Sequence, residues 1–186
     1  MNTLHLTDSP ADIRTAANLL RQGLTVAIPT ETVYGLAADA KNADAVAAIF
    51  EAKGRPQDNP LIVHIGQREQ LAPLVTRVPP TAEKLMDAFW PGPLTLIFPR
   101  SDAVAATVSG GLSTLAVWFP VHPVARAIIN ENGCPLAAPS ANRSGSPSPT
   151  TAAHVAFDLD GRIAAIVDGG PCEVGVPPLR VPSLSQ

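Results

Sequence analysis

The side chains in this sequence that are best suited to chemistry are hydroxyls, cations and an imidazole near the ends of apolar runs. One apolar run, residues 25–29, leads into three hydroxyl-bearing residues, Thr30, Thr32 and Tyr34. Another, residues 61–63, leads into His64. Open α/β sheets bind their ligands in the crevice at the ends of their strands. The sequence therefore predicts a polar binding site where these two runs end.

The three hydroxyls occur at every second residue. In a strand, alternate side chains share one face, so Thr30, Thr32 and Tyr34 could all point toward one ligand. Hydroxyls donate and accept hydrogen bonds, which suits a small polar ligand. The alternative is that Thr and Tyr stand here because they favour strands. The spacing alone does not separate these two interpretations.

Two cations lie in a short turn between the two apolar runs. Lys53 and Arg55 alternate with the turn residues Gly54 and Pro56. A planar guanidinium and a compact ammonium on a stiff loop could hold the phosphates of a ligand. The alternative is a helix that ends in basic residues and is followed by a turn.

Two further candidates have structural explanations of their own. His64 is either a structural residue at a strand end or a ligand-binding one, and no second His, Cys or acid lies nearby at the spacing of a zinc site. Ser140 and Asn142 follow the apolar residues 136–138 and are common turn formers.

The elements that must position these residues follow from periodicity and from helix caps. The pattern predicts helices over residues 10–22, 44–52, 69–75, 81–89, 123–130 and 151–158. It predicts strands over residues 25–29, 61–65, 94–98, 115–119, 136–138 and 163–168. Residues 104–111 are expected to form a loop.

These elements predict an α/β fold with a mixed sheet. Strands 94–98 and 115–119 are joined without a clear helix, so part of the sheet is expected to be antiparallel. The length of 186 residues suits one domain, and we find no repeat or linker within residues 1–186.

Composition limits the function classes. Apolar residues make up 46% of the chain, which allows a sizeable core. The net charge of −3 disfavours nucleic-acid binding through overall charge, although a local basic patch stays open. We expect no transmembrane helix, no signal peptide and a cytoplasmic location. Cys134 and Cys172 lack CxxC spacing and are expected to be structural.

Five motifs, in this order, resemble one known family. They are PTETVYGLA (residues 29–37), KGRP (53–56), NPLIVHI (59–65), PGPLT (91–95) and PSAN (139–142). Together they resemble the YrdC/TsaC family, the threonylcarbamoyl-AMP synthases, over roughly residues 10–175. The resemblance implies a twisted sheet of parallel and antiparallel strands, with flanking helices, around a large concave cavity.

The resemblance also implies a reaction. The family joins L-threonine, bicarbonate or CO₂, and ATP into threonylcarbamoyl-AMP and releases pyrophosphate. The product serves the synthesis of N6-threonylcarbamoyladenosine (t6A) in tRNA, so tRNA or proteins of that pathway are possible partners. Mg²⁺ is expected to accompany ATP. Such chemistry needs positioning and charge neutralisation rather than a covalent intermediate.

The matching positions receive roles from the resemblance. Residues expected to bind threonine are Thr32, Tyr34, His64 and Ala138. Residues expected to bind ATP are Lys53, Arg55, Asn59, Thr114, Ser140, Asn142 and Ser148. No residue is assigned as a general acid or base, and no protein side chain is expected to bind a metal.

Trp118 departs from the family, which carries an arginine after the corresponding Leu-Ala-Val to pair with the threonine carboxylate. A tryptophan offers one N–H donor and no charge. The departure implies weaker threonine binding, a different substrate, or a replacement cation elsewhere. Arg126 and Arg143 are the candidates for that cation.

The chain also departs from the family after Gly175. The family continues with a Glu-Ser-Thr-Val element, whereas residues 176–182 read VPPLRVP. These prolines predict that no regular central strand forms here. We therefore expect residues 176–186 to be an atypical tail, either natural or truncated, that lacks part of the site wall.

Three other functions compete with the synthase. The first is an RNA-binding module, which the acidic net charge of −3 disfavours. The second is a degenerate paralogue that binds nucleotide without making the adenylate, which Trp118 favours. The third is a carbamoyl-adenylate enzyme like the YrdC-like domain of hydrogenase-maturation carbamoyltransferases, which is disfavoured because we recognise none of the other domains of those proteins within residues 1–186.

Overall fold

The computed structural model describes residues 1–176 and 179–182. Within them the strands are β1 Leu4–Leu6, β2 Val26–Ile28, β3 Gly35–Asp39, β4 Ile62–His64, β5 Leu94–Pro99, β6 Thr114–Trp118, β7 Leu136–Ala137, β8 Ala165–Val167 and β9 Leu179–Pro182. The α-helices are α1 Pro10–Arg21, α2 Ala43–Lys53, α3 Pro80–Phe89, α4 Pro123–Asn132 and α5 Ala152–Leu159. Short 3₁₀ helices are η1 Arg68–Gln70, η2 Ala72–Leu74 and η3 Ala106–Ser109.

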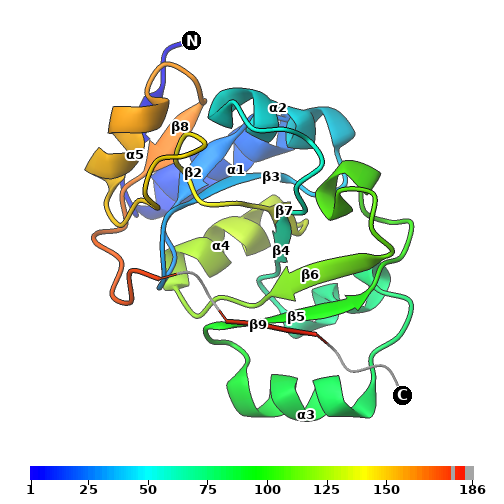
Figure 1. Ribbon diagram of the computed structural model, residues 1–186. Helices are drawn as coiled ribbons and strands as arrows, with labels where there is room; N and C mark the ends of the chain where they lie inside the picture. The colour runs from blue at the N-terminus through cyan, green and yellow to red at the C-terminus, as the bar shows by residue number, and fades with distance from the viewer. Residues whose placement is uncertain (177–178, 183–186) are drawn as a thin grey trace.

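The described strands form one mixed sheet in the order β1-β8-β2-β3-β7-β4-β6-β5-β9. Pairs β1/β8, β2/β8, β4/β6 and β5/β9 are parallel. Pairs β2/β3, β3/β7, β4/β7 and β5/β6 are antiparallel. Figure 1 shows the helices around this sheet, with β9 beside β5 at one edge. The predicted mixed sheet with flanking helices is confirmed.

Helix ends follow the cap residues in the sequence. The Ser9 hydroxyl accepts a hydrogen bond from the Asp12 N–H at the start of α1. The Asn42 side chain accepts from the Ala45 N–H at the start of α2. The same helix ends at Gly54, whose φ of 61° lies in the left-handed region that favours glycine. The α2 end is therefore fixed directly before Arg55.

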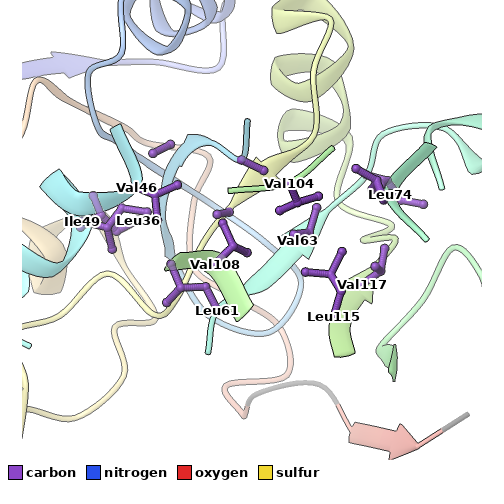
Figure 2. Packing of buried hydrophobic residues seen from close by; sticks show 14 of the residues in the cluster. Leu36, Val46, Ile49, Leu61, Val63, Leu74, Val104, Val108, Leu115 and Val117 are labelled. Carbon is purple, nitrogen blue, oxygen red and sulfur yellow. The ribbon is translucent and has the colours of Figure 1, made fainter. Parts of the chain in front are cut away.

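The core consists of two apolar layers, one on each face of the sheet. Side chains of α2, including Val46 and Ile49, pack with Leu36 and Val63 in one layer (Figure 2). Side chains of α1 and α4 pack in the other layer against Val26, Ile28, Ala37 and Leu136. Because alternate strand residues face opposite layers, the sheet is buried on both sides in its middle.

Residues 69–75 and 104–111 form 3₁₀ helices that were not predicted. Residues 69–75 form the 3₁₀ helices η1 and η2 instead of one α-helix. Pro73 lies inside this segment and has no N–H to donate, which interrupts a continuous helix. The expected loop 104–111 contains η3.

Residues 29–34 do not extend the strand that precedes them. β2 and β3 pair as a hairpin in which Ile28 lies opposite Gly35, so the chain reverses through residues 29–34. The premise that Thr30, Thr32 and Tyr34 share one strand face is therefore wrong. Their directions are set by the turn instead.

Three strands were not expected from the sequence: β3 in the middle of the sheet, and the two edge strands β1 and β9. β1 has only three residues and pairs with β8, far away in the chain. β9 forms within the tail that was expected to lack a strand, and it pairs with β5 alone, as prolines permit at an edge. Residues 177–178 and 183–186 of that predicted tail lie outside the described residues. No helix in the described part of the chain is long and apolar enough to cross a membrane.

Candidate functional site

A pocket of about 120 Å³ lies where β4 and β6 end, beside the turn between β2 and β3. Its lining residues are Thr30, Thr32, Val33, Gly35, Arg55, Pro60, Leu61, Ile62, His64, Trp118, Ala138, Pro139, Ser140 and Arg180. The parallel strands β4 and β6 both end here, at His64 and Trp118. A pocket therefore lies at the strand ends where the sequence predicts a binding site, whereas its role in binding and the large concave cavity stay predictions.

The turn that carries the hydroxyls is organised by Thr30. Its Oγ1 accepts hydrogen bonds from the N–H groups of Thr32 and Val33, both at 3.2 Å, and donates to the Val33 carbonyl. The Thr32 hydroxyl lies 3.2 Å from it. Because Thr30 uses its proton within the turn, Thr32 is the hydroxyl with spare hydrogen-bonding capacity toward the pocket.

Glu31 ties this turn to the rest of the molecule. Its carboxylate is buried and accepts hydrogen bonds from the N–H of Val121 at 2.9 Å and of His122 at 3.3 Å. Its carbonyl accepts from the Val174 N–H at 3.0 Å. No sequence pattern indicates this role of Glu31, because the partners lie about 90 residues away in the chain.

Tyr34 points away from the pocket. Its hydroxyl donates to the Gly170 carbonyl at 2.7 Å and accepts from the Gly169 N–H at 3.2 Å. Burial raises the pKa of Tyr34, so the phenol stays neutral. Thr30 and Thr32 line the pocket and Tyr34 does not, so the expected set of three hydroxyls is reduced to two.

His64 presents a hydrogen-bond acceptor to the pocket. Its Nδ1 lies 3.1 Å from the Ile62 carbonyl, so this nitrogen carries the proton. Complete burial lowers the pKa of His64 to about 4. The ring is therefore neutral near pH 7, and its Nε2 is left with a free lone pair.

Trp118 forms an apolar wall next to His64. The two rings meet edge to face with centroids 4.9 Å apart. The indole N–H donates to the Gly92 carbonyl at 2.6 Å, so its single donor is already used. Neither expected replacement cation lines the pocket: the Arg126 guanidinium lies 5.0 Å from the Phe119 ring centre, and Arg143 is exposed.

Lys53 holds the loop after β7. Its ammonium is buried and donates to the carbonyls of Ser140 and Asn142, while its own carbonyl accepts from the Ser144 N–H at 2.9 Å. Burial, with a smaller contribution from Arg55, lowers the pKa of Lys53 to about 8. Lys53 does not line the pocket, so its phosphate-binding role stays a prediction.

Arg55 does line the pocket. Burial is the first cause that lowers the pKa of its guanidinium, and repulsion from Arg180 is the second. Asp58 acts in the opposite direction. Two guanidiniums that face one pocket would be relieved by an anion between them.

The remaining nucleotide-binding candidates are spread out. Ser140 lines the pocket beside Ala138. The Asn142 amide donates to the carbonyls of Arg143 at 2.8 Å and Ser146 at 2.7 Å, which shapes the loop. Three exposed candidates lie outside the pocket lining: Asn59, Thr114 and Ser148. Ser148 lines a separate hollow with His154 and Phe157.

No cluster of acids, histidines and cysteines suited to a metal occurs among the described residues.

Arg180 is the pocket residue that the sequence did not indicate. The prolines around it obscured the strand that carries it, and its partner on β5, Thr95, is far away in the chain.

A family model of Sua5, YciO and YrdC, described as "Telomere recombination", matches residues 18–178. The threonylcarbamoyl-AMP synthase of Bacillus subtilis is 59% identical over 175 residues, which cover 94% of this chain and 51% of that protein. The synthase of Pyrococcus abyssi is 55% identical over 164 residues, which cover 88% of this chain and 48% of that protein. The chain thus spans about half the length of these curated relatives.

Solved structures show the same fold. The crystal structure of P. abyssi Sua5 complexed with L-threonine matches with a TM-score of 0.94 and 49% identity. The match covers 98% of this chain and 54% of that one.

Proposed function

The chain belongs to the Sua5/YciO/YrdC family, and from this premise we propose that it forms threonylcarbamoyl-AMP from L-threonine, bicarbonate or CO₂, and ATP. The observation that carries the proposal is the pocket at the ends of β4 and β6. It combines two guanidiniums, a neutral imidazole and two threonine hydroxyls in one small space. Relatives of 55–59% identity named threonylcarbamoyl-AMP synthase support it.

The chemistry requires the substrates to be aligned. The threonine nitrogen attacks the carbon of CO₂ and loses a proton, which gives a carbamate. A carbamate oxygen then attacks the α-phosphorus of ATP, and the bond to pyrophosphate breaks. Both steps gain from fixed positions and from cations near the phosphates.

On the amino acid side, we assign Thr32, Tyr34, His64 and Ala138 to threonine. Three of them line the pocket, and Tyr34 supports the site through its contacts to Gly169 and Gly170. The free Nε2 of neutral His64 can accept a hydrogen bond from the amine or hydroxyl of threonine. This requires the amine to lie near the end of β4.

On the nucleotide side, we assign the phosphates to Arg55, with Lys53 and Ser140 beside it. The other residues of this side are Asn59, Thr114, Asn142 and Ser148. Since no acid lines the pocket within residues 1–176 and 179–182, Mg²⁺ would be held by phosphate oxygens of the nucleotide rather than by this part of the protein.

The product would serve t6A synthesis in tRNA, with tRNA or proteins of that pathway as partners in the cytoplasm. A second candidate function is nucleotide binding without synthesis. It is favoured by Trp118, whose uncharged side chain occupies the pocket wall with its donor already used.

The test is pyrophosphate release from ATP and bicarbonate, with and without L-threonine. We expect release that depends on threonine and is lost in Arg55→Met. A matched Arg77→Met variant changes an exposed arginine outside the pocket and should keep full activity. ATP binding without threonine-dependent release would contradict the synthase and support the second candidate.

A further inference from the structure

Four side chains form a row across the sheet beside the pocket. In the strand register, His64 of β4 lies opposite Trp118 of β6, Trp118 opposite Thr95 of β5, and Thr95 opposite Arg180 of β9. Cross-strand partners share one face of a sheet. Three members of the row line the pocket: His64, Trp118 and Arg180.

The neighbouring row confirms this orientation. Val63, Val117, Leu96 and Val181 are the adjacent cross-strand partners, and all four pack into the apolar layer on the opposite face. Because side chains alternate along each strand, the row of His64, Trp118, Thr95 and Arg180 faces the pocket side of the sheet.

The Thr95 hydroxyl lies in a buried position where a hydrogen-bond partner is expected. The residue is completely buried, and its Oγ1 has no hydrogen-bond partner within residues 1–176 and 179–182. Buried hydroxyls are rarely left unpaired in folded proteins. Its cross-strand neighbours are Trp118, whose donor is used, and Arg180.

Arg180 supplies the charge at this end of the row. Arg55 and Arg180 are the charged residues of the lining, and no Asp or Glu lies among the lining residues described. Within the described residues, neither the Arg55 nor the Arg180 guanidinium forms an ion pair. The pocket therefore has two guanidiniums and, among the described residues, no acid of its own.

We propose that Arg180 of β9, assisted by the Thr95 hydroxyl, binds the carboxylate of the amino acid substrate. This inference rests on the proposed function for the nature of that substrate. A planar guanidinium can take both carboxylate oxygens, which the indole of Trp118 cannot do. Arg180 thus supplies the cation that Trp118 does not, from a different strand.

The division of the two guanidiniums follows from what surrounds them. Arg55 follows the end of α2, beside Lys53 and the loop after β7, which is the side assigned to phosphates. Arg180 shares a row with His64 and Trp118. Neighbouring strands lie about 4.8 Å apart, so Trp118 is roughly 10 Å from Arg180 along the backbone row. A long arginine side chain spans part of this distance, and the carboxylate of a small amino acid held near His64 can span the rest.

The test compares L-threonine with L-threoninamide, which has the same shape and no carboxylate charge. Dissociation constants are measured by calorimetry for the full chain and for Arg180→Met. We expect the full chain to prefer threonine, and Arg180→Met to lose about ten- to a hundredfold in threonine affinity. Its affinity for threoninamide and for ATP should stay within about twofold, because neither depends on this contact.

Two further variants control the result. Arg77→Met removes an equal charge from an exposed position and should keep the preference for threonine. Arg180→Lys keeps the charge and should retain part of the preference for threonine over threoninamide. Thermal unfolding of each variant shows whether the fold is kept.

The outcomes separate this inference from the proposed function. Absence of any preference for threonine in the full chain, or a preference that survives Arg180→Met, overturns the inference even if pyrophosphate release occurs. If Arg180→Met binds ATP more weakly but binds threonine with unchanged affinity, Arg180 contacts phosphate instead, and the inference is overturned as well. Loss of the preference in Arg180→Met supports the inference even if no pyrophosphate is released.

Discussion

Two walls of the pocket are built on different principles. The loop wall comprises residues 30–33 and 139–142, and the strand wall comprises Trp118 and Arg180 together with Thr95, which lies between them in the sheet register but does not itself line the pocket. In the loop wall, Glu31 is bonded to the backbone of Val121 and His122, and Lys53 of α2 is bonded to the carbonyls of Ser140 and Asn142, whereas the buried Asn142 Oδ1 lacks a partner among the described residues. In the strand wall, the Thr95 hydroxyl and the Arg180 guanidinium lack such partners within the described residues.

The two walls differ in how their polar groups are held in place before a ligand binds. Bonded groups fix the loop wall before a ligand arrives, which lowers the entropy lost on binding. The strand wall holds groups whose partner must come from the ligand or from water. Substitutions in the loop wall should therefore affect stability, and those in the strand wall should affect binding.

The largest stability effect is expected for Glu31→Ala. The change leaves the buried N–H groups of Val121 and His122 without their acceptor and releases the turn that carries Thr32. We expect the free energy of unfolding to fall by about 2–4 kcal/mol. Urea unfolding measures this, with Glu69→Ala as the exposed control. Equal stability of the two variants would contradict the described role of the loop wall.

His64 stands between the two walls and gives the next effect through pH. Its pKa is lowered from 6.5 to about 4 by burial, so between these values the unfolded chain binds a proton that the folded chain does not. Stability should therefore fall as the pH drops from about 6.5 to 4, by on the order of 2–3 kcal/mol from this group.

Urea unfolding at several pH values measures this contribution as the difference between the full chain and His64→Gln. The exposed His5→Gln variant serves as control. A His64→Gln variant with the same acid sensitivity as the full chain would show that the ring is not buried neutral.

A smaller loss is expected for Lys53→Met. The carbonyls of Ser140 and Asn142 lose their donor, which should lower the free energy of unfolding by about 1–3 kcal/mol at pH 7. The pKa of Lys53 is lowered from 10.5 to about 8, so the unfolded chain holds more protons in this interval. The full chain should therefore gain stability relative to Lys53→Met as the pH rises from 8 toward 10.5.

Thermal unfolding of both proteins at these pH values checks this prediction, with Lys84→Met as a control on α3. A difference that shrinks as the pH rises would contradict the described environment of Lys53.

The smallest effect should have the opposite sign. Thr95→Val replaces a buried, unpaired hydroxyl by a methyl group of similar size. We expect stability to rise by up to about 1 kcal/mol, because no hydrogen bond is lost. Threonine affinity should fall at the same time. Thermal unfolding and calorimetry test the pair of effects, and a loss of stability without a change in affinity would remove the contrast between the walls.

The sequence predicted most of the regular structure near its caps. α1, α2 and α5 begin where Ser9, Asn42 and Thr151 can accept hydrogen bonds, and α2 ends at Gly54. The mixed sheet also followed from the order of the elements. The prediction failed at residues 69–75, where Pro73 interrupts the helix, and it missed the central strand β3, which pairs with β2 and β7.

The candidate site was predicted in part. Pocket residues found from the sequence include Thr32, Arg55, His64, Ala138 and Ser140. Tyr34 was assigned to threonine by the resemblance, and strand alternation would have let it share a face with Thr30 and Thr32, but the hairpin turn directs it elsewhere. Residue types identified the chemistry, but not the direction of each side chain.

What the sequence by itself determined was local: caps, turns, alternation along strands and the motifs of a family. What only the tertiary structure decided was which distant groups meet. Glu31 finds its partners near residue 121, and Arg180 enters the pocket because β9 pairs with β5 at the edge of the sheet. Such contacts depend on strand order and register, which join segments far apart in the chain and leave no short-range pattern in the sequence.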